Sequence, residues 1–255
     1  MVSAARRPLM RLLRRSARRA WHVLCVVLVV PGSAALADIK AARYTKETTR
    51  YAHGVLGDAV EYGALEITLT NGKRRVLTLP QDRVFEDIAP RLVDVDGNGD
   101  VEVIVVESSQ SGGARLAIYD ETGLRAATPH IGQRNRWLAP VGAADLDGDG
   151  HMEIAYIDRP HLAKTLRVWR YKDGALTEVA NKAGLTNHRI GEDFISGGIR
   201  DCDQTAGQGL EMITVNANWS QVIATSFDGK TLTSRAIGPF KGQASLRAAL
   251  ACKAN

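Results

Sequence analysis

The sequence predicts an all-β protein, a small β-propeller of about four blades built from four-stranded antiparallel sheets, with a short helical tail at the C-terminus. Three observations predict this fold. An acidic turn recurs, because Asp94 and Asp145 begin near-identical stretches 51 residues apart and a weaker copy begins 56 residues later at Asp201. An aromatic residue follows each of these aspartates after 25 or 26 residues. Apolar runs flank the turns, and periods of this length are typical of repeated supersecondary units.

Within each repeat the pattern is that of short strands. An apolar run enters the acidic turn, a β-branched run such as residues 103–106 leaves it, and a third run alternates apolar and polar residues. Asp-Gly pairs at 173–174 and 228–229 are typical of hairpin turns into a fourth strand. Residues 62–69 with the Asn-Gly turn at 71–72 resemble a degenerate first copy that has no acidic loop.

The repeat pattern divides the chain into four units and a tail. We expect the units at residues 38–85, 86–135, 136–190 and 191–240, and the tail at residues 241–255. In the tail, the spacing of Leu246, Ala249 and Leu250 predicts a short helix within residues 244–254. Radial closure of the four sheets would protect their edges, which a linear stack leaves exposed.

Residues 1–37 have the pattern of a secretory signal peptide. They contain seven arginines and no acidic residue, then an apolar run over residues 21–30, then small residues that end in Ala35-Leu36-Ala37. This order predicts cleavage after Ala37. The apolar run is short for a bilayer span, and an uncleaved membrane anchor is the alternative. We therefore expect a protein exported to a periplasm or secreted, with no integral membrane segment after signal cleavage.

Removing this segment changes the sign of the charge. The whole chain has 33 basic and 28 acidic residues, and without the seven N-terminal arginines 26 basic residues remain, a formal net charge of −2. Because binding to nucleic acid needs a basic face, we expect no nucleic-acid partner. Only Cys202 and Cys252 follow residue 37. Two cysteines in an oxidising compartment most simply form a disulfide, and two unrelated buried thiols are the alternative.

The acidic turns predict calcium sites. Each turn has oxygen-bearing side chains at loop positions 1, 3, 5 and 9 and glycines where the backbone turns sharply, which suits a hard cation such as Ca²⁺. The side-chain ligands expected in the two loops are Asp94, Asp96, Asn98 and Glu102, and Asp145, Asp147, Asp149 and Glu153, with Asp100 and His151 contributing backbone carbonyls. Two solvated turns that bind no ion are the alternative.

An EF-hand is excluded as the origin of these loops. It requires a bidentate glutamate at position 12 and flanking helices, whereas position 12 here is Val105 or Tyr156, within a strand-like run. The first loop offers three carboxylates and one amide, and the second offers four carboxylates. Because more ligand charge generally raises calcium affinity, this count predicts tighter binding at the second loop.

The third copy of the loop is weaker than the other two. It begins with Asp201, Cys202 and Asp203, has two extra residues before Glu211, and offers fewer anionic groups. A disulfide from Cys202 to Cys252 would tie this loop to the C-terminal tail. We therefore expect that the disulfide stabilises the third loop as an ion stabilises the others.

The Asp-x-Asp-x-(Asp/Asn)-Gly loops followed by apolar strands resemble FG-GAP/VCBS-type repeats, the repeats of integrin-α-like β-propellers, over about residues 90–235. The resemblance implies that the loops hold Ca²⁺ between the first and second strands of a blade. It also implies a secreted or surface module in adhesion or recognition. The sequence departs from the family pattern at position 9, where Glu102 and Glu153 replace the commoner aspartate. The Phe-Gly and Gly-Ala-Pro landmarks of the family are not clearly present.

No catalytic or cofactor-binding constellation stands out. The histidines after residue 37 are scattered without metal-ligand spacing, and the sequence has no Gly-x-Ser-x-Gly elbow or phosphate-binding glycine loop. Trp137, Trp169 and Trp219 line a sugar-binding face or, more commonly for isolated aromatics, belong to the core. We expect a non-enzymatic calcium-binding module for binding, adhesion or scaffolding, with a protein or glycan partner. A hydrolase or lyase acting on polysaccharide or phosphoester is the alternative.

Overall fold

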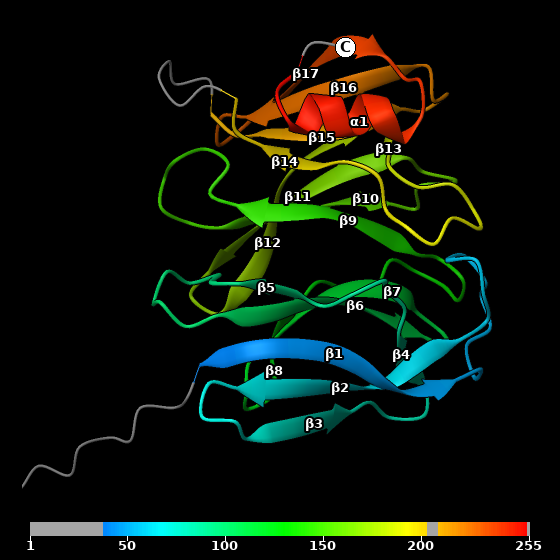
Figure 1. Cartoon of the computed structure of the whole chain (residues 1–255), viewed down its shortest axis with the longest axis vertical. Helices are drawn as coiled ribbons and strands as arrows, with labels where there is room; N and C mark the ends of the chain where they lie inside the picture. Colours follow the sequence, from blue (N-terminus) through cyan, green and yellow to red (C-terminus); the bar gives the residue numbers. More distant parts are fainter. Residues whose placement is uncertain (1–37, 203–208, 254–255) are drawn as a thin grey trace, which may run out of the picture. The chain divides into compact units, whose positions relative to one another are not determined.

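Strands build almost all of the regular structure in the part of the chain that the computed structural model describes, residues 38–202 and 209–253. They form three hydrogen-bonded sheets of eight, four and five strands. Figure 1 shows these sheets following one another in chain order. The all-β prediction is therefore confirmed. The predicted signal peptide, residues 1–37, lies outside the described residues.

The first sheet contains strands β1 to β8. They are β1 (Ile39–Thr48), β2 (Glu61–Leu69), β3 (Arg74–Thr78), β4 (Arg83–Phe85), β5 (Arg91–Val93), β6 (Glu102–Ser109), β7 (Gly113–Tyr119) and β8 (Leu124–Ala127). β2 pairs with β1 and β3, and β6 pairs with β5 and β7. The repeat pattern predicts two units here, and the short β4 pairs with both β2 and β6 and so joins their strands into one sheet.

The second and third sheets are antiparallel. The second contains β9 (Leu138–Ala144), β10 (Glu153–Asp158), β11 (Thr165–Lys172) and β12 (Ala175–Ala183) in sequential order, and the third contains β13 (Leu185–Thr186), β14 (Gly198–Arg200), β15 (Glu211–Asn216), β16 (Gln221–Phe227) and β17 (Leu232–Pro239). Every residue of β6 and β10 is buried. Strands covered on both faces need apolar side chains at successive positions, which explains the unbroken β-branched runs after the acidic turns.

Three apolar clusters hold neighbouring layers together. One lies between β2 and the β6–β7 pair, the next between that pair and the second sheet, and the last between the second and third sheets. Representative members are, in this order, Leu65 with Val105, Ile104 with Tyr156, and Val168 with Met212. The repeats are therefore stabilised by packing face to face, as blades are, and not only by their own hydrogen bonds.

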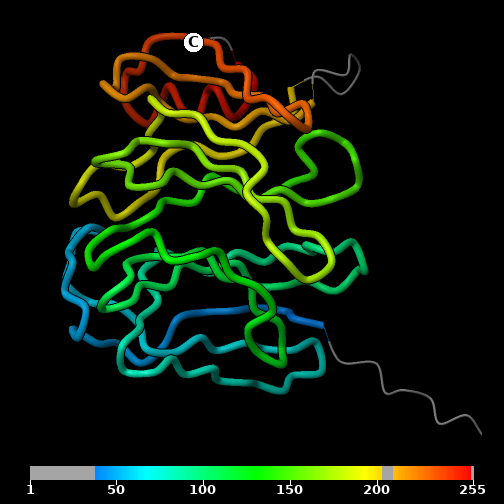
Figure 2. Tube along the Cα trace, turned by 180° about the vertical axis from the view of Figure 1, so that it is seen from behind, coloured from blue at the N-terminus to red at the C-terminus, as the bar shows by residue number. Residues whose placement is uncertain are grey.

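The helix α1 (Gln243–Leu250) covers the last sheet. Its Leu246 and Ala249 are buried against Ile213 and Val222. In a closed ring the last sheet would pack against the first, but Figures 1 and 2 show β1–β3 and α1 at opposite ends of the described chain. No closed propeller is present among the described residues, so the four-blade ring stays a prediction.

Glu61, at the start of β2, predicts how stability depends on pH. Burial, followed by repulsion from Glu86 and Asp58, raises the pKa of Glu61 from 4.5 to about 9. Between these values the folded chain keeps a proton that the unfolded chain has lost, so stability falls as pH rises from 4.5 to 9. We expect Glu61→Gln to weaken this fall, measured by thermal denaturation across the range. The exposed Glu47→Gln is the control, and equal slopes for wild type and Glu61→Gln would contradict the expectation.

Candidate metal centre

The first acidic loop connects β5 to β6 and is organised by its own backbone. The two carboxylate oxygens of Asp94 accept hydrogen bonds from the amides of Gly97 at 2.7 Å and Gly99 at 3.0 Å. Both glycines have left-handed φ angles, 73° and 96°, which side-chain-bearing residues adopt at a cost. Glu102, the first residue of β6, closes the loop because its Oε2 accepts from the amide of Val95 at 2.9 Å.

Three carboxylates converge in this loop. Oxygen atoms of Asp94, Asp96 and Glu102 lie within 4.8 Å of one another. Burial raises the pKa of Glu102 to about 7, with a further contribution from the negative charges of Asp96 and Asp94 and an opposing one from the Val95 amide. No arginine or lysine in the described chain forms an ion pair with these three residues. Arg125 lies near enough to lower the pKa of Glu102 slightly, but it forms no direct ion pair with the cluster. The cluster is therefore an oxygen-only donor set of the kind that suits a hard cation.

The second acidic loop repeats the same turn between β9 and β10. Asp145 accepts from the amides of Gly148 at 2.8 Å and Gly150 at 3.0 Å. Glu153 Oε2 accepts from the amide of Leu146 at 2.9 Å, as Glu102 does from Val95. Oxygens of Asp145, Asp147 and Asp149 lie within 4.8 Å of one another, and Glu153 is outside this group. The two loops thus share the same hydrogen bonds between carboxylates and backbone amides. They differ in which carboxylates come close together, since the glutamate belongs to the group only in the first loop.

Arg170 explains the difference between the loops. This β11 residue is the register partner of Glu153, and its Nε lies 2.5 Å from Glu153 Oε1. The other guanidinium nitrogens contact Asp147, and Asp149 at 2.9 Å. Three of the four predicted carboxylate ligands of the second loop are thus already paired with one cationic side chain.

The first loop has no counterpart of Arg170. Val103 pairs with Tyr119 in the first sheet as Ile154 pairs with Trp169 in the second. The residue after Tyr119, at the place of Arg170, is therefore Asp120, which carries the opposite charge. Asp120 itself pairs with Arg125 at 3.5 Å. The register of the repeats thus places an aspartate in the first repeat where the second has its paired arginine.

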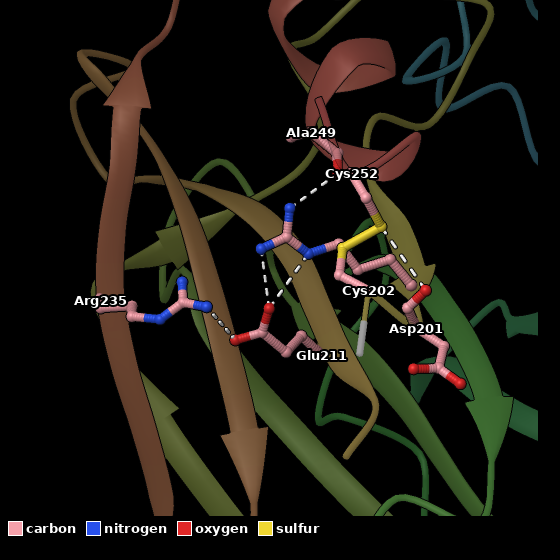
Figure 3. The surroundings of a disulfide bond; sticks show 7 residues. Asp201, Cys202, Glu211, Arg235, Ala249 and Cys252 are labelled. Atoms are coloured by element: carbon pink, nitrogen blue, oxygen red, sulfur yellow. Dashed lines mark hydrogen bonds and ion pairs between the residues drawn. A yellow bond between two sulfur atoms is a disulfide. The ribbon is translucent and has the colours of Figure 1, made fainter. Parts of the chain in front are cut away.

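The third copy is held by arginines and a disulfide, as Figure 3 shows. Glu211, at the start of β15, forms ion pairs with Arg200 at 2.7 Å and with Arg235 at 2.8 Å. The predicted disulfide joins Cys202 to Cys252, whose Cα atoms are 5.4 Å apart. Asp203, the other aspartate of this copy, lies outside the described residues.

The remaining predicted ligands lie at the edges of the clusters. Asn98 and Asp100 are exposed, and Asn98 Oδ1 accepts from the amide of Asp100 at 2.7 Å. His151 is half-buried and lines a cavity of about 230 Å³ together with Asp96 of the first loop and Arg125. The residues missed by sequence reasoning are Arg170, Arg200 and Arg235. Pairing each glutamate at position 9 with the residue facing it on the next strand would have found Arg170.

The comparisons with known proteins agree with the loop geometry. Residues 94–156, which span both acidic loops, match the FG-GAP-like repeat family. This part of the chain is similar to an FG-GAP-like repeat. The matched FG-GAP-like repeat begins at the first aspartate of one loop and ends within β10, so it contains all the residues of both carboxylate clusters.

The other comparisons are weaker. No curated protein matches the sequence. Among solved structures it is similar to a Bacteroides fragilis protein provisionally named a 6-phosphogluconolactonase, with 15% sequence identity and a TM-score of 0.40 over 72% of this chain. The matched part is 54% of that protein, so the chain spans about half of its length.

Proposed function

We propose that this protein is an exported, non-enzymatic repeat module for recognition of a protein or glycan, in which Ca²⁺ stabilises the first acidic loop. The observation that carries the proposal is the convergence of Asp94, Asp96 and Glu102 without a direct ion pair to an arginine or lysine of the described chain. Bound Ca²⁺ would supply a positive charge there and fix the β5–β6 junction. The FG-GAP-like repeat supports a binding role.

The order of affinity that we infer is the reverse of the one that counting carboxylates predicts. Four carboxylates favour the second loop, but Arg170 pairs with three of them, and a cation entering that loop would have to displace the guanidinium. In the first loop a cation displaces no side chain. We therefore place the principal Ca²⁺ site at Asp94, Asp96 and Glu102.

Export rests on two observations. The sequence of residues 1–37 has the order of a signal peptide, and the Cys202–Cys252 disulfide is stable in oxidising compartments. In the described chain, no helix has the length and apolar character needed to cross a membrane. A periplasmic or extracellular location accounts for both the signal-peptide pattern and the disulfide. Such compartments also supply Ca²⁺ for binding to the loop.

Calcium-dependent melting tests the proposed function. A ligand present at a hundred times its Kd stabilises the fold by about 2.7 kcal/mol, so we expect chelation to lower Tm by several degrees. Asp96→Asn should remove most of this Ca²⁺ response. Asp147→Asn, the matched change at position 3 of the second loop, should alter stability and keep the response.

Calorimetry of the purified protein, with and without a chelator and with an ion count, makes these measurements. A melting curve that ignores chelation contradicts calcium binding. A response that is lost in Asp147→Asn and kept in Asp96→Asn contradicts the assignment to the first loop. Turnover of a polysaccharide or phosphoester that disappears in Asp96→Asn, with the melting curve unchanged, would show an enzyme.

A further inference from the structure

A cleft lies at the strand ends opposite to the acidic loops. The acidic loops precede β6 and β10, whereas the cleft is formed where these strands end, by the segments that follow β1, β8, β10 and β13. It encloses about 280 Å³ and is lined by His53, Asn135, Arg136, Trp137, Arg159, His161, Leu162 and Ile190. The sequence separates these residues by up to 137 positions, so the cleft exists only in the folded chain.

The lining is cationic. It contains Arg136 and Arg159 and no acidic residue. Arg136 forms no ion pair with an acidic residue of the described chain. Arg159 pairs with Asp158 at 2.8 Å, but Asp158 also pairs with Arg167 at 2.9 Å. Arg167 also pairs with Glu178 at 2.7 Å, so these two arginines are balanced by two carboxylates. The positive charge without an ion pair at the cleft is therefore that of Arg136, although the chain after residue 37 is slightly acidic overall.

His161 contributes a hydrogen-bond acceptor to this cleft. His188 Nε2 lies 2.9 Å from the carbonyl oxygen of Glu192, so this nitrogen carries the proton and His188 Nδ1 is an acceptor. His161 Nε2 lies 3.0 Å from that Nδ1 and therefore donates to it. Burial, followed by the neighbouring His188 and His53, lowers the pKa of His161 to about 4, so the ring is neutral. Its Nδ1 is consequently unprotonated and is able to accept a hydrogen bond from a ligand.

His53 is oriented by a buried carboxyl group. Its Nδ1 lies 2.6 Å from Oε1 of Glu86, a residue with no exposed surface, and the other oxygen of Glu86 accepts from Ser108. Trp137 Nε1 donates to the backbone carbonyl of Glu86 at 2.8 Å. With Nδ1 engaged, Nε2 is the His53 nitrogen left for a ligand. A buried network that fixes one ring at the wall of a cleft is typical of a preorganised site.

Two residues of the lining have strained backbones. Asn135 and Arg159 have φ angles of 57° and 47°. Such left-handed conformations are uncommon outside glycine and cluster at ligand-binding positions, because the surrounding structure must hold them in place. They lie in the two segments that carry Arg136 and Arg159.

We propose that this cleft binds a small hydroxylated anion, a hydroxy acid or a phosphate ester, with Arg136 and Arg159 facing the anionic group and His161 Nδ1 accepting from a hydroxyl. Nε and Nη2 of Arg159 are paired with Asp158, which leaves Nη1 for a ligand. Guanidinium nitrogens form charge-assisted hydrogen bonds with carboxylate and phosphate alike, so the charge chemistry is shared by both ligands. The neutral imidazole adds selectivity for a ligand that also carries a hydroxyl. This site is separate from the calcium loops and does not depend on the function proposed for them.

Calorimetric titration of the wild-type protein with four probes tests the ligand class. Tartrate and glycerol 3-phosphate combine an anion with hydroxyls, succinate lacks the hydroxyls, and threitol lacks the charge. We expect binding of tartrate or glycerol 3-phosphate at millimolar concentrations, and the one that binds identifies the anionic group. Succinate should bind more weakly than tartrate, and threitol should not bind. Binding of neither hydroxylated anion, or threitol binding as tightly as tartrate, would overturn the proposal.

Variants locate the site. Arg136→Gln should weaken binding of the hydroxylated anion about tenfold, since it removes a charge-assisted hydrogen bond. Arg74→Gln removes the same charge from an exposed position on β3 and should leave the affinity unchanged. His161→Phe keeps an aromatic ring beside Trp137 and should abolish the preference for tartrate over succinate. Melting curves confirm that each variant is folded, and an unchanged affinity in folded Arg136→Gln would overturn the assignment.

Discussion

Replacing Arg170 with glutamine is expected to lower the free energy of unfolding by about 3 kcal/mol, because removing one partner of a buried ion pair leaves an uncompensated charge. Glu153 is fully buried, and Arg170 is its cationic partner at 2.5 Å. Asp147 and Asp149 lose the same partner and repel one another more strongly. Without Arg170, the carboxylates of the second loop lack a direct ion pair, as those of the first loop do.

Added Ca²⁺ should restore part of the stability that Arg170→Gln loses. In Arg170→Gln the second loop gains an open set of carboxylates, so we expect added Ca²⁺ to raise Tm more in the variant than in the wild type, and the bound-ion count to rise by one. Chemical denaturation with and without Ca²⁺ measures both effects. Arg43→Gln, which removes an exposed arginine on β1, is the control and should change stability little. Equal calcium responses in wild type and Arg170→Gln would show that the guanidinium and the ion do not compete.

Loss of the Cys202–Cys252 disulfide should have an effect of similar size. The bridge closes a loop of 50 residues, which on the chain-entropy model contributes about 4 kcal/mol. Cys252→Ser should therefore lower the denaturation midpoint strongly, as should reduction of the wild type without chelation. The effect should be local, because the bridge ties the third acidic loop to the end of α1.

Amide hydrogen exchange shows where the structure loosens. We expect faster exchange in α1 and β14 after reduction, and little change in β6 and β10. The hydrogen bond from Arg200 to the carbonyl of Ala249 at 2.7 Å remains and should keep part of the helix contact. Chelation without reduction should give the opposite pattern, with faster exchange at the β5–β6 junction. If reduction instead accelerated amide exchange equally in all three sheets, the disulfide would not act specifically on the third copy of the loop.

Much of the local structure was predictable because it depends on short-range patterns. The β-branched runs after Glu102 and Glu153 became β6 and β10, the Asn71-Gly72 pair became a hairpin turn, and the tail formed a helix. The two acidic turns fold alike because their aspartates and glycines bond within nine residues. The disulfide was predictable from the number of cysteines and the expected compartment.

The rest depends on pairings between distant residues. Arg170 neutralises part of the negative charge of the second loop because strand register places it opposite Glu153. The corresponding position of the first repeat holds Asp120. Counting the carboxylates of each loop reveals neither of these pairings. His53 and His161 are far apart in sequence and meet only where successive repeats pack. The repeat pattern also did not predict that β4 pairs with both β2 and β6, because a strand of three residues gives no periodic signal.

The helix that covers the last sheet also restricts how such an array can lengthen. A repeat added beyond β17 would need the apolar surface around Ile213 and Val222 that Leu246 and Ala249 now occupy, so α1 and its cysteine would have to detach first. A duplicated repeat inserted between β12 and β13 would instead find a matching layer on each side. Longer relatives, evolved or engineered, are therefore expected to gain repeats by internal insertion and to keep α1 on the last sheet.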